Sequence, residues 1–484
     1  MTDLGRPLAG GTEEPLQAQL RQRIVAAIGE GRLARGHPLP PSRRLAKQLG
    51  VARNTVAAVY DELRERGLLA SAPRQGIFVA ADAPSLPPLR APAAAVLRLR
   101  LRPSEQRNIA KPADWQSFPF PFVYGQVDPE LFPLADWRAC SREALGRSAV
   151  NWWAADHATA DDPLLIEQIR RHILPARGLH ARPEEVLVTL GSQHGLFLLL
   201  QLLGGPGVTV GLEDPGYPDA RNMAALGGSA TRLLPVDGEG LMVGPALEGV
   251  GLAVVTPGHH CPSMVTLPPA RRAALLRWAR DSGAVLIEDD YESETAQPGA
   301  PPCLAADDTE GRVLHLGTFS KVLAPGMRLG FLVGPAAVIA EARALRRLMH
   351  RSVPLNNQRT AALFIAEGHY GRLRRSLAAT AEKRRIAVLA ALRRELPHFT
   401  PSPAAAGSSL WLRGPAGLDG VVLAEAARAR GVIIEPGEPF FADPAAGRNF
   451  LRLGLSSIPT ERIAPGIAAL AAAVRDVPGP REPP

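Results

Sequence analysis

Lysine and cysteine are scarce in this 484-residue sequence, and long hydrophobic runs are missing. The three cysteines, Cys140, Cys261 and Cys303, are too few and too widely spaced for a disulfide framework or a zinc cluster. No apolar run approaches the roughly 18 residues of a transmembrane helix, and the first residues lack a basic segment followed by an apolar one. We therefore expect a cytoplasmic protein with free thiols, no structural metal and no membrane association.

Only four of the 55 basic residues are lysines, at positions 47, 111, 321 and 383. Arginine keeps its proton in proteins, whereas a lysine amine can lose it and attack a carbonyl carbon. Lys321 follows a short apolar run and a serine in "HLGTFSKVLAPGMRLGF". It is therefore a candidate for covalent chemistry. The alternative is that a lysine stands here by chance, and the neighbouring residues must decide between the two.

The net charge of +8 is concentrated near the N-terminus. Residues 1–80 hold twelve basic and seven acidic side chains, and residues 81–112 hold six and two, so the rest of the chain is close to neutral. A basic N-terminal region followed by a nearly neutral remainder indicates that the N-terminal region binds an anionic polymer. We expect this partner to be double-stranded DNA.

Three apolar-striped segments within residues 16–67 predict three helices. In the first, apolar residues recur every four positions from Leu16 to Ile28. The second and third, "SRRLAKQLG" and "RNTVAAVYDELRERG", are joined by a tight turn, which is typical of a helix-turn-helix. The N-terminal end of the later helix would then enter the major groove with Arg53, Asn54 and Thr55.

After Gly67, "LLASAPRQGIFVA" predicts two short strands around a turn, the wing of a winged helix with Arg74 at its tip. A protein-binding three-helix bundle is the alternative, but the basic charge and the wing favour DNA. "LPPSRRLAKQLGVARNTV" and "RQGIFV" resemble the GntR-type winged helix, although Pro41 replaces the usual capping serine, and we expect Ser42 to cap instead. The resemblance implies DNA contacts from Arg43, Arg44, Arg53 and the wing around Gly76.

Residues 81–118 are rich in proline, alanine and arginine, which is typical of an extended linker. Beyond them, short β-branched runs such as "VLVTL", "AVLIEDD" and "GFLVG" alternate with helical patterns, which indicates a mostly parallel sheet covered by helices. We predict an α/β chain with a winged helix in residues 1–80, this linker, and a second domain in residues 119–484. Ligands of such sheets bind beyond the carboxyl ends of the strands.

The residues at these strand ends together suit pyridoxal phosphate. The cofactor needs a lysine for its aldehyde, a carboxylate at its pyridine nitrogen, donors for its phosphate and an aromatic face. Lys321 and Asp289 supply the first two, Tyr217 is the expected stacking ring, and Tyr291 the partner of the ring hydroxyl. The expected phosphate donors, at turns that open helices and on a nearby arginine, are Gly191, Ser192, Gln193, Thr318, Ser320 and Arg328.

Two alternatives stay open for these residues. Asp289 and Asp290 could bind a divalent metal together with His259 and His260, although their spacing matches no ligand motif. Lys321 could bind a phosphate without covalent chemistry. The coincidence of "SK" with the upstream "EDDY" turn favours the cofactor.

From about residue 119 to 470 the chain resembles a fold-type I aminotransferase, through "VTLGSQ", "LEDPGYPDAR", "LIEDDYESE" and "LGTFSKVLAPGMRLGFLV" in that order. With its winged helix it resembles the MocR/GabR-type regulators. The resemblance implies a smaller C-terminal α+β subdomain and a homodimer in which each linker passes its DNA-binding domain to the partner. It also implies Lys321 as the internal aldimine lysine, Asp289 as pyridinium partner, Tyr217 as stacking ring and Arg452 as the ligand of an effector carboxylate.

Departures from the family pattern surround the effector pocket. Asp161 stands at a family glycine, and Leu165-Ile166 at a family Leu-Arg. "TPGHHCPSM" replaces "TPSHQFPTG", which introduces Cys261 and Met264. These changes leave the cofactor prediction standing and bear on which ligand binds.

We thus predict a regulator in which an amino compound displaces Lys321, forms an external aldimine and alters DNA binding. A working aminotransferase with an accessory basic domain is one alternative. A DNA-binding protein whose body lost its cofactor and only dimerises is another.

Overall fold

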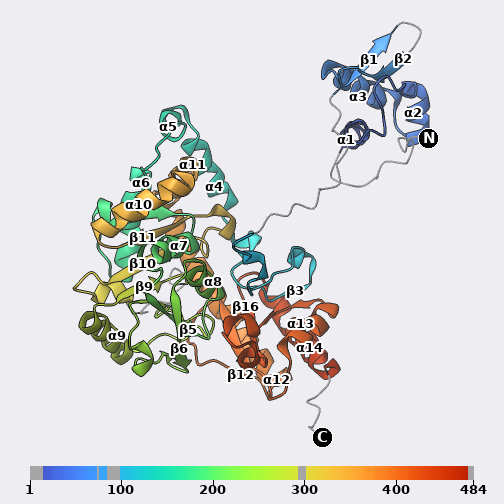
Figure 1. Ribbon diagram of the computed structural model, residues 1–484. Coiled ribbons are helices and arrows are strands. Elements are labelled where there is room, and N and C mark those ends of the chain that lie inside the picture. Colours follow the sequence, from blue (N-terminus) through green and yellow to red (C-terminus); the bar gives the residue numbers. More distant parts are fainter. Residues whose placement is uncertain (1–14, 73–75, 84–98, 293–300, 478–484) are drawn as a thin grey trace. The chain divides into compact units, whose positions relative to one another are not determined.

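The computed structural model describes residues 15–72, 76–83, 99–292 and 301–477, which fall into two compact units (Figure 1). The first unit ends at Arg100, and the second begins at Leu101. Arg74, the predicted tip of the wing, lies outside the described residues. No helix in the described ranges is long and apolar enough to cross a membrane.

The first unit is the winged helix-turn-helix that the sequence predicted. Its three helices pack through the predicted apolar stripes, with Leu20, Ile24, Leu45, Val56 and Leu63 fully buried. The wing is an antiparallel pair of strands. The elements are α1 (Leu16–Gly29), α2 (Ser42–Leu49), α3 (Arg53–Glu65), β1 (Leu69–Ala72) and β2 (Gly76–Val79).

The expected cap of α2 was wrong. Ser42 is the first helical residue, and no side chain caps this helix. The Pro41 carbonyl instead accepts hydrogen bonds from the backbone N–H groups of Arg44 and Leu45. A capping side chain must belong to the residue before the first turn, and proline at that position has no hydrogen-bonding side chain.

An eight-stranded sheet forms the centre of the second unit, in the order β4-β11-β10-β9-β8-β5-β6-β7. β11 runs antiparallel to β10 and β4, and β7 antiparallel to β6, while the other pairs are parallel. The sequence did not predict β6 and β7. The strands are β4 (Val186–Thr189), β5 (Thr209–Asp214), β6 (Ala230–Asp237), β7 (Gly240–Leu241), β8 (Leu252–Val255), β9 (Val285–Asp289), β10 (Val313–Thr318) and β11 (Gly330–Val333).

Helices cover both faces of this sheet, which explains the nearly continuous apolar strands. α7 (Ser192–Leu203), α8 (Pro218–Leu226) and α10 (Ala336–His350) pack on one face. α9 (Pro269–Ser282) packs on the other face, and α6 (Pro163–Gln168) and α11 (Leu355–Ala366) pack near β4 and β11. α4 (Leu134–Ala144) packs against α11, with α5 (Arg147–Trp153) beside them.

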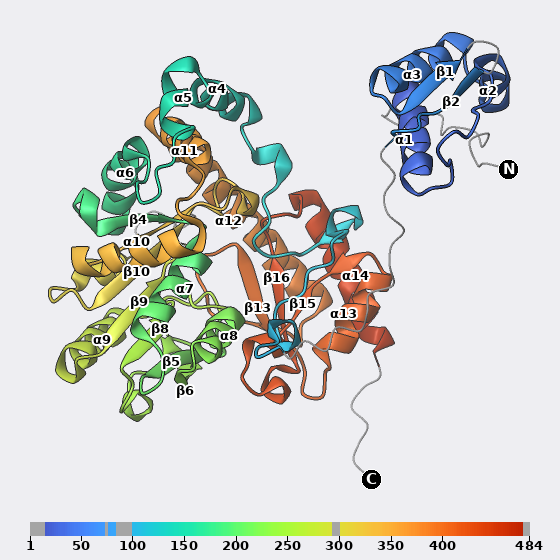
Figure 2. The ribbon, with the colours of Figure 1, turned by 45° about the horizontal axis from the view of Figure 1, so that its top comes forward.

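A smaller C-terminal α+β part completes the unit (Figure 2). The long helix α12 (His369–Glu395) connects the two parts by packing against both α11 and α14. A four-stranded sheet has the order β12-β13-β16-β15, and β3 pairs with β14 separately. The elements are β3 (Phe120–Pro121), β12 (Thr400–Pro401), β13 (Ser409–Arg413), α13 (Gly420–Ala429), β14 (Val432–Ile433), β15 (Glu435–Pro436), β16 (Phe450–Gly454) and α14 (Thr460–Asp476).

The expected linker is not uniform in structure. Its end, from Leu101, belongs to the second unit and includes two short 3-10 helices, Pro103–Glu105 and Trp115–Ser117. Residues 106–111, which we call the strap, are tied to α8 and to the segment after β15. The Gln106 side chain donates to the Asn222 carbonyl at 3.4 Å, and Arg107 donates to the Ala442 carbonyl at 2.9 Å.

Candidate functional site

A cavity of about 290 Å³ lies beyond the carboxyl end of β9, where the sequence placed the site. It combines side chains from the strap, from the strand ends of the large sheet and from β16 of the C-terminal part. The residues that line it are Asn108, Ile109, Lys111, Tyr124, Ser192, Tyr217, Asp219, Cys261, Asp289, Tyr291, Lys321 and Arg452.

Lys321 follows β10 and directs its amine into this cavity. Its Nζ lies 4.1 Å from the ring centroid of Tyr124 and 6.0 Å from that of Tyr291. Burial lowers the pKa of Lys321 to about 8, and Lys111 and Arg452 add to this effect while Glu292 opposes it. An amine with such a pKa is partly unprotonated near neutral pH, as a nucleophile must be.

Asp289 ends β9 and is only 7 % exposed. Burial raises its pKa to about 7, with a smaller contribution from the Asp290 carboxylate and an opposing one from a hydrogen bond with Ser192. Its Oδ1 atom is buried and has no hydrogen-bond partner among the described residues. A buried carboxylate oxygen left in this way suits a cationic or N–H group from a ligand.

The three tyrosines of the cavity have different partners. Tyr217 precedes α8, and its hydroxyl donates to Asp219 Oδ2 at 3.2 Å. The Tyr291 hydroxyl lies 3.6 Å from the Met264 sulfur, a weak acceptor. Tyr124, which the sequence analysis did not select, donates to Glu292 Oε2 at 2.6 Å and stands edge-on to Tyr291.

The turn from β4 into α7 supplies the first group of predicted phosphate donors. Gly191 has a φ of 82°, a conformation that favours glycine, and Ser192 begins the helix. Ser192 is hydrogen-bonded to Asp289, and the Gln193 amide donates to Asp219 Oδ2 at 2.7 Å. The N-terminus of α7 thus points its backbone donors toward the cavity.

The second group of predicted donors lies around Lys321. The Thr318 hydroxyl donates to Ser320 Oγ at 3.0 Å, and the Ser320 backbone N–H donates to Thr318 Oγ1 at 3.2 Å. Arg328 donates to the Leu190 carbonyl at 2.5 Å, and its Nη2 would lie 3.1 Å from a Cβ on Gly191. The two groups of donors are therefore adjacent.

Arg452 reaches the cavity from β16 and is 2 % exposed. Its Nε donates to Glu435 Oε2 at 2.6 Å, and its guanidinium stacks on the Tyr124 and Phe440 rings at 4.2 and 4.6 Å. Glu435 is the one carboxylate paired with Arg452 in the described part of the chain.

Six of the eleven predicted cofactor and effector residues line the cavity, and the other five do not. On the wall are Ser192, Tyr217, Asp289, Tyr291, Lys321 and Arg452. The five that do not line it are Gly191, Gln193, Thr318, Ser320 and Arg328.

The alternative metal site is not assembled. The Arg177 guanidinium donates to both carboxylate oxygens of Asp290, at 2.8 and 3.3 Å. His260 is engaged on both ring nitrogens, with the Ser263 hydroxyl and the Pro215 carbonyl. Within the described ranges, the side chains that could jointly hold a metal are two other groups, Cys140, Glu367 and His369, and Glu288, Cys303 and His315.

The departures from the family pattern have structural roles. Asp161 is buried and pairs with Arg343 and Arg346 at 2.6 and 2.5 Å. Cys261 lines the cavity, where burial raises its pKa to about 12. Met264 contacts Tyr291, so the altered loop shapes the cavity wall.

The predicted DNA-contacting residues that the structure describes lie on one unit and are mostly exposed. Arg53 and Asn54 open α3 and are exposed, while Thr55 is half-buried. Arg43 and Arg44 are exposed on α2, and the exposed Gly76 begins β2 with a φ of 87°.

Five residues that bear on the site were not predicted from the sequence: Lys111, Asn108, Tyr124, Asp219 and Glu435. The rarity of lysine, which singled out Lys321, applies equally to Lys111. Asp219 lies within the motif "LEDPGYPDAR", two residues after Tyr217, and could have been selected with it. The roles of Asn108, Tyr124 and Glu435 depend on contacts between distant segments. Asn108 Nδ2, for example, donates to Asp219 Oδ1 at 2.5 Å across the cavity mouth.

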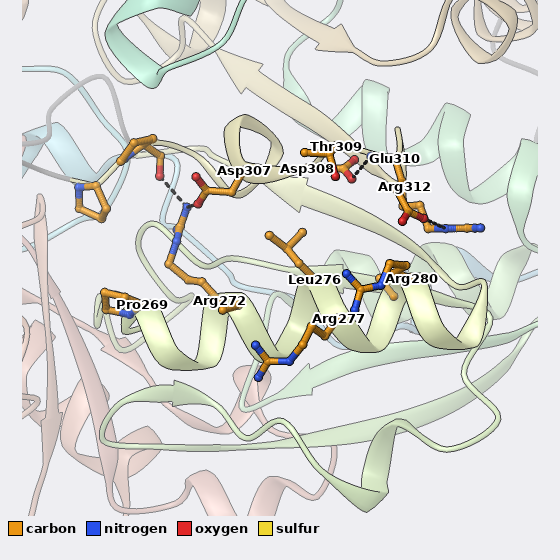
Figure 3. A pocket seen from close by; sticks show the side chains of 14 residues that line it. Pro269, Arg272, Leu276, Arg277, Arg280, Asp307, Asp308, Thr309, Glu310 and Arg312 are labelled. Carbon is orange, nitrogen blue, oxygen red and sulfur yellow. Dashed lines mark hydrogen bonds and ion pairs between the residues drawn. The ribbon is translucent and has the colours of Figure 1, made fainter.

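A second and larger cavity, of about 620 Å³, contains none of the predicted residues. It lies between α9 and residues 301–312, and Figure 3 shows Arg272 reaching from the helix toward Asp307. The Arg272 Nη2 donates to the Pro302 carbonyl at 2.7 Å. No lysine and no aromatic residue is among the described residues that line this cavity, so these residues offer no comparable chemistry.

Comparisons with known proteins agree with this arrangement. Residues 16–79 match the bacterial regulatory proteins of the gntR family, and residues 158–470 match aminotransferase class I and II. The chain is 42 % identical to the HTH-type transcriptional regulator TauR of Rhodobacter capsulatus, over 97 % of this chain and 98 % of that protein. It is 30 % identical to the probable rhizopine catabolism regulatory protein MocR of Rhizobium meliloti, over 95 % and 94 %.

Among solved structures, an archaeal alanine:glyoxylate aminotransferase is similar, with a TM-score of 0.69 and 28 % identity. The match covers 73 % of this chain and 90 % of that one. The Pyrococcus horikoshii kynurenine aminotransferase is similar at a TM-score of 0.68 and 26 % identity, over 73 % and 90 %.

Proposed function

The chain belongs to the MocR-type HTH transcriptional regulators, in which a gntR-family DNA-binding domain precedes an aminotransferase class I and II domain, and on this premise we propose that it senses an amino compound through pyridoxal phosphate on Lys321. Proteins with the aminotransferase class I and II fold depend on this cofactor. One observation carries the proposal: an amine, a carboxylate and an aromatic ring, from Lys321, Asp289 and Tyr217, meet in one cavity.

The cavity residues fit the cofactor in two respects. The unpartnered Asp289 Oδ1 suits a pyridine N–H. The turn at Gly191 presents backbone N–H groups and would place a Cβ, if one existed, 3.1 Å from the Arg328 guanidinium. An anion at the start of α7 would therefore meet both backbone donors and a positive charge.

When bound, pyridoxal phosphate supplies an electron-withdrawing ring to the amine that is joined to its aldehyde carbon. Lys321 would hold that carbon covalently, since its lowered pKa leaves part of the amine unprotonated. Asp289 would keep a proton on the pyridine nitrogen, and Tyr217 would cover one face of the ring. The residues placed to donate to the phosphate are Gly191, Ser192, Gln193, Thr318, Ser320 and Arg328.

An effector amine would compete with Lys321 for the same carbon, and Arg452 would bind an acidic group on the effector. The guanidinium is held in place by Glu435 and by stacking on Tyr124, so it is positioned before the effector arrives. Regulation then requires that the effector bind the two DNA-binding states of the protein with different affinity.

We also propose a homodimer, because helix-turn-helix regulators bind paired half-sites with two-fold symmetry. Two large apolar side chains of α10 are exposed in the single chain, Leu348 at 77 % and Met349 at 46 %. A second copy of the chain that packed on α10 would remove them from water. Sedimentation equilibrium of the full chain is the test, and a monomer at all concentrations would contradict this part.

The sensing proposal is tested by the visible absorption spectrum of the purified protein during titration with amino acids and ω-amino acids. A band that shifts and then persists with one compound identifies an effector and a sensor without turnover. A band that is lost, and that returns on addition of a keto acid, identifies a working aminotransferase. A protein that never acquires a visible band on incubation with pyridoxal phosphate contradicts the cofactor assignment.

A further inference from the structure

Lys111 places a second positive charge at the mouth of the cavity, from a segment outside the aminotransferase match. It belongs to the strap, whereas the matched region begins at residue 158. Its side chain is 30 % exposed, and its Nζ lies 5.8 Å from the Tyr124 ring centroid. The amines of Lys111 and Lys321 thus both lie near the Tyr124 ring.

The two lysine amines are close together. A Cβ on Gly125 would lie 2.7 Å from the Nζ of Lys321 and 3.7 Å from the Nζ of Lys111. Gly125 has a φ of 72° and no side chain, so nothing of its own stands between them. A ligand whose amine replaces that of Lys321 therefore has Lys111 only a few bonds away.

Lys111 has donors to spare. An ammonium group carries three N–H donors. Among the described residues, its partners are the Tyr124 carbonyl, to which it donates, and Glu435, whose Oε1 lies 3.9 Å away. Because Glu435 already pairs with Arg452 at 2.6 Å, that single carboxylate faces two cations and neutralises only one of them.

Within the proposed sensing function, we propose that Lys111 is a specificity-determining residue that binds the acidic group of the effector. The effector is then a short amino compound with a carboxylate or sulfonate a few bonds from its amine. Its acid group lies between Lys111 and Arg452, which together provide one more positive charge than Glu435 cancels. An amine of the same length without an acid gains nothing from Lys111.

A contact between the effector and Lys111 would also affect how firmly the strap is held. Gln106 and Asn108 fasten the strap to α8 through Asn222 and Asp219, and Arg107 fastens it to Ala442 in the segment after β15. Of these three partners, Asp219 lines the cavity. The same strap continues toward the DNA-binding unit in the sequence. Binding of an acid group by Lys111 therefore holds the strap more tightly against the cavity.

The test compares Lys111→Met, which keeps most of the length of the side chain without the charge, with Lys111→Arg, which keeps the charge. The probes are 3-aminopropanoate, 2-aminoethanesulfonate and propylamine, each titrated into the cofactor-loaded full-length protein and followed by its visible spectrum. Loss of the Lys111 charge also raises the pKa of Lys321, and this effect is common to all three probes. We therefore expect Lys111→Met to raise the dissociation constant of the acidic probes by about tenfold or more relative to that of propylamine. Lys111→Arg should stay near the wild type, and the two acidic probes show which acid is preferred.

A second measurement is independent of the spectrum. Trypsin cleavage after the exposed Arg107 reports how firmly the strap is held. An acidic probe should slow this cleavage several-fold in the wild type and in Lys111→Arg, and not in Lys111→Met. Cleavage after Lys111 is not informative, because proline follows it.

Two results overturn the inference. One is an equal loss of affinity for propylamine and for the acidic probes, which assigns Lys111 to the structure of the cavity. The other is an unchanged affinity for all probes in Lys111→Met. A wild-type spectrum that responds to none of many amines instead contradicts the proposed sensing function itself, so the two failures are distinguishable.

Discussion

Arg452 and Glu435 form a buried ion pair on neighbouring strands, with 2.6 Å between Nε and Oε2 and both side chains only 3 % exposed. The register of β15 against β16 places these two residues directly opposite each other. The pair holds the guanidinium at the cavity wall, where Arg452 stacks on Tyr124. Burying two charges has a large desolvation cost, so removing one partner of the pair should lower the stability of the protein measurably.

Glu435→Ala should lower the free energy of unfolding by about 3–5 kcal/mol, because it leaves the Arg452 charge buried without a partner. Urea unfolding followed by circular dichroism measures this. The matched control is Asp476→Ala, which removes an exposed pair with Arg430 of the same 2.6 Å length and should cost less than about 1 kcal/mol. Equal losses in the two variants would contradict the structural role of the buried pair.

Lys321→Ala should abolish the visible absorption that pyridoxal phosphate gives to the protein, since the covalent attachment is lost. Its far-ultraviolet circular dichroism should not change. Lys383→Ala removes an exposed lysine from α12 and is the control that should keep the full visible band. A visible band that survives in Lys321→Ala would end the covalent assignment.

Cofactor binding should strengthen as the pH rises from ~6 to ~8. The cofactor needs Asp289 ionised and the Lys321 amine neutral, and the protein alone has pKa values of about 7 and about 8 for these groups. Raising the pH favours the required form of both, so the two effects have the same sign. Equilibrium dialysis against pyridoxal phosphate measures the dependence.

Asp289→Asn should bind the cofactor more weakly at pH ~8 and show a shallower pH profile, because only the Lys321 contribution remains. The same dialysis compares the variant with the wild type. An identical slope would mean that Asp289 does not titrate in this range.

Arg53→Ala should weaken binding to an operator duplex selected from random DNA by about 1–3 kcal/mol, without changing the cofactor spectrum. Gel-shift titration at fixed salt measures the loss. Arg64→Ala, on the same helix but paired with Asp61 at 3.1 Å, is the control. Unchanged binding by Arg53→Ala would mean that another element reads the groove.

Much of the fold could be predicted from local patterns. The apolar stripe of α3, with Val56 and Leu63 buried, follows from the period of a helix. The strands that end at Asp289 and Thr318 are buried on both faces, so their sequences are mostly apolar and easily recognised. By contrast, β6 has mostly exposed side chains, and its sequence lacks that signal.

The sequence by itself determined which chemical groups stand at the strand ends, because a parallel sheet brings its carboxyl ends to one edge. It therefore indicated Lys321, Asp289 and Tyr217 together. Only the tertiary structure decided that Lys111 lies at the same cavity. The strap reaches the mouth through contacts such as Asn108 with Asp219, which join residues 111 positions apart. Such long-range contacts depend on how whole elements pack, and no local pattern of residues encodes them.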